Sequence, residues 1–312
     1  MSIRHEKRGH SEAVLRLQLR STGGGAAAKG TECPLFQYDS YELPRVADRG
    51  IILWRTLGVA SVKIDLHVHT SRYSACSRMS SDELVEEARR AGLDAVVLTE
   101  HNWAWDAPDL AALCDDQLLV LGGVEITCRE GDCLVYAPEL AGLHRGSSLE
   151  ELAEEVRTRG GLTVLAHPFR TTLERDRRYL ANPLDGLEQE SCNNFGRLER
   201  EAAEVVARSA DLLLVSASDA HATDMLGCFY LELEREVSDI AGLASELRRG
   251  AYRCCRDDER FYRFLDARLS TFRARVRSEV LGGVGDLSAL KRATGVSSDV
   301  IREVLAESPP PR

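Results

Sequence analysis

The segment Ile64-Asp-Leu-His-Val-His69 sets the interpretation of the whole sequence, because it is a short apolar run that ends in two histidines. Side chains two residues apart in a strand point to the same face, so His67 and His69 would project together from one edge. Two imidazoles placed in this way are a natural chelate for a metal ion. The segment therefore predicts a buried strand and the beginning of a ligand set.

Six more apolar runs with a β-branched bias follow this segment. Near-continuous apolar runs are typical of strands that are buried on both faces, as in parallel sheets. With helical patterns between them, the runs predict a βα barrel or a doubly wound sheet, in which functional residues lie at the C-terminal ends of strands. The seven predicted strands are Val62–His69, Ala95–Thr99, Leu118–Thr127, Cys133–Tyr136, Leu162–Ala166, Gly186–Glu190 and Leu212–Ser216.

Helix start signals lie between these runs. Ser80 with Glu83, and Ser148 with Glu151, have the spacing of a capping box, in which the two side chains satisfy each other's backbone amides. Ser238 predicts the start of a third helix.

Composition divides the 312 residues into three parts. Residues 1–60 are rich in glycine and alanine, which predicts a partly flexible N-terminal extension, with an edge element around Arg45–Leu57 as the alternative. Residues 61–252 form the predicted barrel domain. Residues 253–312 form a predicted C-terminal helical region.

The segment Arg248–Arg277 contains ten arginines, which predicts a salt-bridged surface helix, with guidance of a nucleic-acid strand as the alternative. The helices around Gly295 resemble a helix-turn-helix. Lys291, however, occupies a position where that motif prefers a small residue, so a helical cap on the barrel is favoured over DNA recognition.

The formal net charge of −10 argues against non-specific coating of nucleic acid, which needs many cationic side chains. No apolar stretch reaches the length of a membrane helix, and the charged start of the chain does not resemble a secretory signal. The nine cysteines are scattered without a CxxC pair. This pattern predicts reduced thiols and a cytoplasmic location, with no membrane partner.

Five of the eight histidines lie at or just past the C-terminal ends of predicted strands. A lone histidine in such a place is more often a hydrogen-bonded core residue than a ligand. In a closed barrel, however, equivalent strand ends converge on one mouth, so several such histidines together predict a metal site. The five residues are His67, His69, His101, His167 and His221.

Carboxylates accompany these histidines at Glu125, Asp219 and Glu100. Glu125 ends an apolar run, where an unpaired charge would be very costly. Nitrogen and oxygen donors without a thiolate suit Zn²⁺, Mn²⁺ or Fe. A bridging carboxylate, for which Glu125 is the best candidate, would allow two or three divalent ions.

These motifs resemble those of the PHP superfamily, named for polymerase and histidinol phosphatase. The resemblance extends from about Val62 to Arg253 and implies a distorted (β/α)7 barrel with a two- or three-metal centre at its mouth. The motifs, in order, are Asp65-Leu-His67-Val-His69-Thr, Thr99-Glu-His101-Asn, Gly123-Val-Glu125-Ile, Leu165-Ala-His167-Pro and Ser218-Asp219-Ala-His221.

The same resemblance implies a ligand set for each ion. His67, His69 and Asp219 would hold one, Glu125 and His167 a second, and His101 and His221 a third, with Glu125 shared.

Three positions depart from the family pattern. Cys76 lies where members often have a histidine or aspartate, and it is more simply a plain thiol. Asp132 or Cys133 lies near the place of another expected histidine. Glu100 replaces the more usual aspartate, and it would either bind metal or orient His101.

PHP proteins hydrolyse phosphoesters, and the Thr-Glu-His-Asn motif is most similar to the branch with 5′–3′ exoribonucleases and 3′,5′-nucleotide bisphosphate phosphatases. The resemblance therefore predicts an enzyme that acts on nucleotides or on short single-stranded 5′-phosphorylated oligonucleotides. A small-metabolite phosphatase, such as a histidinol phosphatase, is the alternative, and an inactive metal- or nucleic-acid-binding module is a third hypothesis. No stable protein partner is implied.

The predicted nucleophile is a hydroxide that bridges the ions at Glu125. Arg170 would neutralise charge on the phosphoryl oxygens, and His101 or His221 would protonate the leaving oxygen. Asn193 either contacts substrate or forms a turn. A basic loop nearby would hold a second phosphate or would simply be solvated; its residues are Arg175, Arg177 and Arg178.

Overall fold

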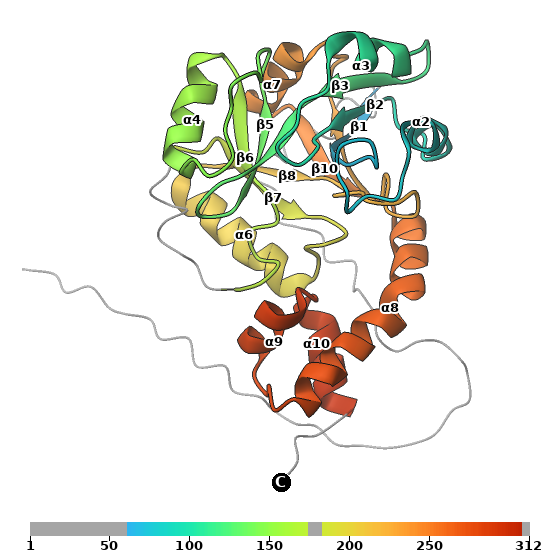
Figure 1. The fold of residues 1–312 in the computed structure, drawn as a ribbon, viewed down its shortest axis with the longest axis vertical. Helices are drawn as coiled ribbons and strands as arrows, with labels where there is room; N and C mark the ends of the chain where they lie inside the picture. Colours follow the sequence, from blue (N-terminus) through green and yellow to red (C-terminus); the bar gives the residue numbers. More distant parts are fainter. Residues whose placement is uncertain (1–60, 174–182, 308–312) are drawn as a thin grey trace, which may run out of the picture. The chain divides into compact units, whose positions relative to one another are not determined.

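The structure, a computed structural model, describes residues 61–173 and 183–307 (Figure 1). They all belong to one compact unit, Pro44–Arg312. The predicted N-terminal extension and the basic loop with Arg175, Arg177 and Arg178 lie outside the described residues, so both stay predictions.

The first sheet has five strands and brings the end of β1 beside the end of β2. Strands β1, β2 and β3 are parallel, whereas β9 pairs antiparallel with both β1 and β10. The strands, in sheet order, are β10 (Tyr252–Arg256), β9 (Phe229–Leu233), β1 (Val62–Val68), β2 (Ala95–Leu98) and β3 (Leu119–Gly122).

The second sheet also has five strands. Strand β5 is antiparallel to both its neighbours, and β6, β7 and β8 are parallel. In sheet order they are β4 (Val124–Thr127), β5 (Asp132–Tyr136), β6 (Leu162–Leu165), β7 (Gly186–Glu190) and β8 (Leu213–Ser216).

The chain is therefore a mixed α/β protein, and the closed (β/α)7 barrel is not found among the described residues. Two isolated bridges link the sheets, one between Val68 and Ala220 and one between His101 and Glu125. The prediction that the strands are parallel was wrong at β5. The connection between β4 and β5 is too short for a parallel crossover, so the two strands pair antiparallel.

The predicted strand Leu118–Thr127 is in fact two strands that meet at Gly123. A Cβ at this position would lie 2.9 Å from the carbonyl oxygen of Val135 and 3.1 Å from a methyl group of Thr99. Only glycine fits where the chain passes from one sheet to the other. This crossing places Glu125 beside the end of β2.

The helices begin where the sequence places their caps, with one shift. Ser80 and Ser148 both form capping boxes, as predicted. The third helix is capped by Asp239 instead of Ser238, because it is the Asp239 carboxylate that accepts from the Gly242 amide. The helices are α2 (Ser81–Arg90), α3 (Ala107–Leu113), α4 (Leu149–Thr158), α6 (Arg197–Ala210), α7 (Ile240–Arg248), α8 (Asp258–Leu281), α9 (Leu287–Thr294) and α10 (Ser298–Glu307).

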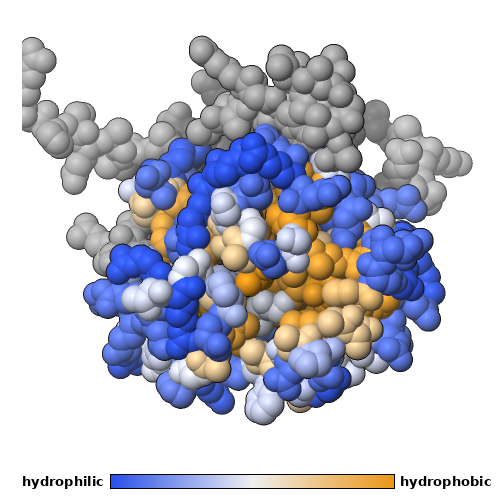
Figure 2. All heavy atoms as spheres, turned by 90° about the horizontal axis from the view of Figure 1, so that it is seen from above, coloured by the Kyte–Doolittle hydropathy of each residue, from blue (hydrophilic) through white to orange (hydrophobic). Residues whose placement is uncertain are grey.

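Apolar side chains of both sheets form the core. One cluster lies between the second sheet and helices α4 and α6, and another joins the first sheet, the second sheet and α7. Viewed from above, apolar residues gather at the centre of one face and hydrophilic residues surround them (Figure 2). Within residues 61–173 and 183–307, no helix combines the length and apolar character needed to cross a bilayer.

Helices α9 and α10 pack on α8, and α10 also packs on α6. Lys291 of α9 is fully buried, and its ammonium nitrogen lies 2.5 Å from a carboxylate oxygen of Glu199 on α6. The same carboxylate accepts from the Ser298 amide at 2.7 Å. These contacts supply a structural role for Lys291, and they favour the predicted helical cap.

Candidate metal centre

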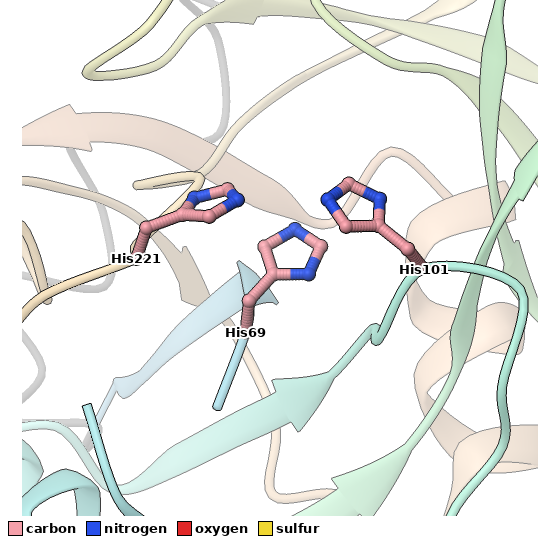
Figure 3. Close-up of side chains that lie close together, drawn as sticks. All are labelled: His69, His101 and His221. Carbon is pink, nitrogen blue, oxygen red and sulfur yellow. The ribbon is translucent and has the colours of Figure 1, made fainter. Parts of the chain in front are cut away.

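The five strand-end histidines converge. His67 lies in β1, and His69, His101, His167 and His221 follow strands β1, β2, β6 and β8. Figure 3 shows the rings of His69, His101 and His221 turned toward one another, and the ring centroids of His69 lie 4.4 Å and 4.3 Å from those of His101 and His221. Side chains that are up to 154 positions apart in sequence thus share one site, since the parallel strand ends meet there.

Glu125 is the central carboxylate of this group. Its Oε2 atom lies 2.8 Å from Nδ1 of His101, 3.3 Å from Nε2 of His69 and 3.4 Å from Nε2 of His67. Its Oε1 atom lies 3.1 Å from Nε2 of His167. The side chain is fully buried. The carboxylate is thus placed to be shared between ions, as the sequence predicts for a bridge.

Asp219, which follows strand β8, is the second carboxylate of the site. Its Oδ1 atom lies 3.3 Å from Nε2 of His67 and 3.5 Å from both Nε2 of His69 and Nδ1 of His221. The side-chain amide of Asn193 donates to the Oδ2 atom of Asp219 at 2.9 Å. Asn193 therefore orients a carboxylate of the site, a role that the sequence analysis did not consider.

Four buried polar atoms at the centre have no hydrogen-bond partner within the described residues: Nε2 of His67, Nε2 of His69, Oε2 of Glu125 and Oδ1 of Asp219. Such atoms are rare in folded proteins, and each needs an explanation. Each of the two imidazole nitrogens lies 3.3–3.5 Å from both carboxylate oxygens, close enough for one ion to contact all four atoms. A divalent cation satisfies all four, and the residues present therefore fit a metal ion.

Glu188 of β7 fixes the orientation of the His67 imidazole and the backbone position of His167. Its Oε1 atom lies 3.0 Å from Nδ1 of His67, and its Oε2 atom accepts from the backbone amide of His167 at 2.9 Å. Because a carboxylate accepts at Nδ1, one proton of His67 sits there, and Nε2 is the nitrogen that would bind a metal in place of a second proton. Glu188 was not predicted as a site residue; its only signal in the sequence is a carboxylate inside a predicted buried strand.

Removal of one Glu188 oxygen is expected to weaken metal binding without unfolding the chain. In Glu188→Gln, a single carbonyl oxygen cannot accept from both His67 and His167, so one ligand loses its support. We expect the metal affinity to fall by about 10–100-fold, measured by competition with a chromogenic chelator. Glu190→Gln, in the same strand, is the matched control, because Glu190 pairs with Arg200 instead. Equal affinities for the two variants would contradict this role.

Three groups of ligand atoms emerge among the described residues, each with its atoms within 4.8 Å of one another. Asp132 joins the second group, which favours Asp132 over Cys133 as the ligand near that place. The third group takes His69 in addition to the two histidines that the resemblance implied. The groups are His67, His69 and Asp219; Glu125, Asp132 and His167; and His69, His101 and His221.

Glu100 belongs to none of these groups. Its carboxylate accepts from the Thr70 amide, from the Ser74 hydroxyl at 2.5 Å and from the indole N–H of Trp105 at 3.0 Å. Ser74 in turn accepts from the backbone amide of His101 at 3.2 Å. Of the two roles considered for Glu100, these contacts favour the orientation of His101 over metal binding.

The backbone is strained at two of the metal-facing residues. His167 and Asp219 have φ angles of 30° and 51°, in a region that residues other than glycine rarely adopt. Such conformations persist where surrounding contacts hold them, and they gather at functional sites. The hydrogen bonds from the His167 amide to Glu188 and from Asn193 to Asp219 supply those contacts.

The electrostatics of the site favour a bound cation. Burial lowers the pKa of His69 to about 3, so this imidazole is neutral and free to act as a ligand. Burial opposes a charge on His67, yet the negative Asp219 and Glu125 hold its pKa well above the usual range. Burial also raises the pKa of Asp65 to about 6; this carboxyl accepts from the Ser218 amide beneath the site.

Arg170 lies next to the site in the chain, and its backbone amide donates to the carbonyl of His167 at 3.1 Å. Its side chain passes Gly295, where Cγ lies 4.0 Å from the position of a Cβ. No contact between its guanidinium and the histidine cluster is found among the described residues, so its catalytic role stays a prediction.

Comparison with known proteins agrees with this geometry. Residues 197–252, which include Asp219 and His221, match the family model described as PHP-associated. Two crystal structures are similar to this chain. A two-domain protein from Bacteroides vulgatus, described as containing a predicted PHP-like metal-dependent phosphoesterase, is 18% identical with a TM-score of 0.50 over 66% of this chain and 70% of that one. The chain has a PHP-like fold.

PsfC from Pseudomonas syringae PB-5123 has the same kind of fold, with 17% identity and a TM-score of 0.52 over 67% of this chain and 96% of PsfC. An uncharacterized protein of Methanocaldococcus jannaschii is 29% identical over 120 residues, which is 35% of this chain and 68% of that protein. The match at residues 197–252 and the likeness to the Bacteroides vulgatus protein agree with a PHP-like fold. They do not distinguish the exoribonuclease branch from the others.

Proposed function

We propose that this protein is a metal-dependent phosphoesterase that acts on nucleotides or on short 5′-phosphorylated oligonucleotides. The observation that carries the proposal is the set of four buried, unpartnered ligand atoms from His67, His69, Glu125 and Asp219. A buried site of this kind has little structural value without a cation. The PHP-like fold supports phosphoester hydrolysis as its chemistry. A cytoplasmic location is part of the same proposal.

The residues of the site would have different roles in this reaction. His67, His69 and Asp219 would hold one ion and Glu125, Asp132 and His167 another. When bound, divalent ions supply positive charge to the phosphoryl oxygens and lower the pKa of coordinated water.

His101 and His221 are the most accessible of the five imidazoles, with 34% and 21% of their side chains exposed. The Nδ1–H of His221 donates to the carbonyl of Asp219 at 3.0 Å, so the proton that it can give to a leaving oxygen is at Nε2. Either imidazole serves this step when it is not holding a third ion.

An aromatic stack next to His101 favours nucleotides over small metabolites. Trp103, two residues after His101, is 56% exposed, and one face of it stacks on Tyr73 with centroids 5.4 Å apart. Tyr73 packs edge-on against Trp105, and the guanidinium of Arg72 lies 4.7 Å from the Trp105 ring. Tyr73 thus covers one face of the Trp103 ring, and the other face is available to a nucleobase.

Loss of this face is expected to affect substrates that carry a base. Stacking of one base contributes about 1–3 kcal/mol, so we expect Trp103→Ala to lower kcat/KM for adenosine 5′-monophosphate about tenfold. The rate with ribose 5-phosphate should change far less. Leu281→Ala is the matched control, because Leu281 is also an exposed large apolar residue but lies on α8. An equal loss for both substrates would count against base recognition.

The function itself is tested with purified protein and Mn²⁺. The substrates are a 5′-phosphorylated oligoribonucleotide, adenosine 5′-monophosphate and histidinol phosphate. We expect release of mononucleotides or inorganic phosphate from the first two. Turnover of histidinol phosphate alone would overturn the nucleotide assignment, and no turnover of any phosphoester by metal-loaded protein would overturn the phosphoesterase assignment.

A further inference from the structure

A cavity of about 430 Å³ opens beside His221. This volume lies in the range of small-molecule sites. The cavity is bounded by the loop after β1, by the turn after β8 and by helix α8 of the C-terminal region. Its lining residues are Cys76, Arg78, His221, Ala222, Met225, Arg268 and Thr271.

Arg78 brings one positive charge to this cavity. Its backbone amide donates to the carbonyl of His221 at 2.8 Å, which fixes the loop against the histidine cluster. The Arg78 side chain is exposed and makes no hydrogen bond or ion pair with any residue that the structure describes. Its guanidinium is therefore available to a ligand.

Arg268 of α8 also lines the cavity, with its guanidinium paired to Asp224. Its Nη2 atom lies 3.1 Å from both carboxylate oxygens of Asp224, and its guanidinium lies 5.3 Å from the Phe264 ring. These contacts hold the guanidinium in place while Nε and Nη1 have no partner within the described part of the chain. Thr271 lies one turn further along α8 and also lines the cavity.

The other arginines of α8 that form ion pairs are not among the residues that line the cavity. The predicted salt-bridged helix Arg248–Arg277 is thus found only from Asp258 onward, because Tyr252–Arg256 pairs with β9 as strand β10. The pairs are Arg260 with Glu87, Arg263 with Glu259, Arg273 with Glu303 and Arg277 with Glu307.

We infer that this cavity is a subsite for a second anionic group of the substrate, held by Arg78 and Arg268. The inference rests on the proposed function, because it places the reacting phosphoryl group at the histidine cluster. Two guanidiniums and a hydroxyl suit a phosphate or a carboxylate. The cavity adjoins His221, so one small molecule can reach both places. Helix α8 then determines specificity, which gives the C-terminal region a role in the reaction.

The test compares substrates that differ only in the second anion. Adenosine 3′,5′-bisphosphate against adenosine 5′-monophosphate tests a phosphate, and 3-phosphoglycerate against glycerol 3-phosphate tests a carboxylate. We expect the wild type to prefer the doubly anionic member of at least one pair by about tenfold or more in kcat/KM. In Arg78→Ala and Arg268→Ala this preference should fall toward one. Arg263→Ala, on the same helix but outside the cavity, should retain it.

Binding provides a readout that does not need turnover. Calorimetry with metal-free protein and adenosine 3′,5′-bisphosphate should show at least tenfold weaker binding in each cavity variant than in Arg263→Ala. Binding that depends on the arginines without turnover would keep the subsite and refute the phosphoesterase. Turnover without any dependence on the arginines would refute the subsite alone. If loss of the Arg268–Asp224 ion pair disturbs folding, the comparison is made with Arg78→Ala alone.

Discussion

Glu125→Gln is expected to remove nearly all phosphoester turnover. Its carboxylate lies within 3.4 Å of the imidazole nitrogens of His67, His69, His101 and His167. A glutamine has the same shape, but it lacks the negative charge that two ions would share. We expect kcat/KM to fall by at least about 10²–10³-fold, measured with Mn²⁺-loaded protein and the best substrate of the panel.

The control for this variant is Glu154→Gln, which changes an exposed glutamate of α4. Far-UV circular dichroism should show that both variants are folded. A Glu125→Gln protein that kept more than a tenth of the wild-type kcat/KM would show that this carboxylate does not organise the reaction.

Lys291→Met is expected to cause the largest loss of stability among simple substitutions in the helical cap. Lys291 and Glu199 are both fully buried, and the methionine would leave the Glu199 carboxylate without its cation. Removal of one partner of a buried ion pair costs about 3–5 kcal/mol of unfolding free energy. Urea unfolding measures this loss as a lower midpoint at an unchanged slope.

A second substitution separates the charge effect from the loss of packing. In Lys291→Met with Glu199→Gln, the amide oxygen still accepts from the Ser298 amide, but no charge remains buried. We expect the double variant to recover at least half of the lost free energy. A cost below about 1 kcal/mol for the single variant would show that the cap does not depend on this pair.

Continuous apolar runs revealed the strands of the site, whereas alternating ones were missed. Strand β6 is buried along its whole length, and β1 is buried from Ile64 to Val68, so apolar residues dominate both sequences. Strand β9, Phe229–Leu233, buries every second residue, and β10, Tyr252–Arg256, is half-buried along its length. Such patterns give a weak signal in a single sequence, because partners far away in the chain decide whether the segment pairs.

The histidines of the site could be inferred because each follows a strand. Residues whose role depends on contacts with distant parts of the chain could not be inferred from the sequence. Asp132 joins a ligand group only because β5 runs antiparallel beside β4. Glu188 supports His67 only because the fold brings its carboxylate to the Nδ1 atom of that imidazole. Glu100 lies next to His101 in sequence, yet hydrogen bonds from Thr70, Ser74 and Trp105 occupy its carboxylate. Neighbours along the chain do not predict such contacts.

The metal content of the purified protein tests the central claim most directly. After dialysis against Mn²⁺ or Zn²⁺ and removal of free metal, elemental analysis should find at least two equivalents per chain. Treatment with a chelator should remove them, and Glu125→Gln should retain fewer. Less than one equivalent in the folded wild-type protein, with either metal, would contradict a clustered metal centre at these histidines and carboxylates.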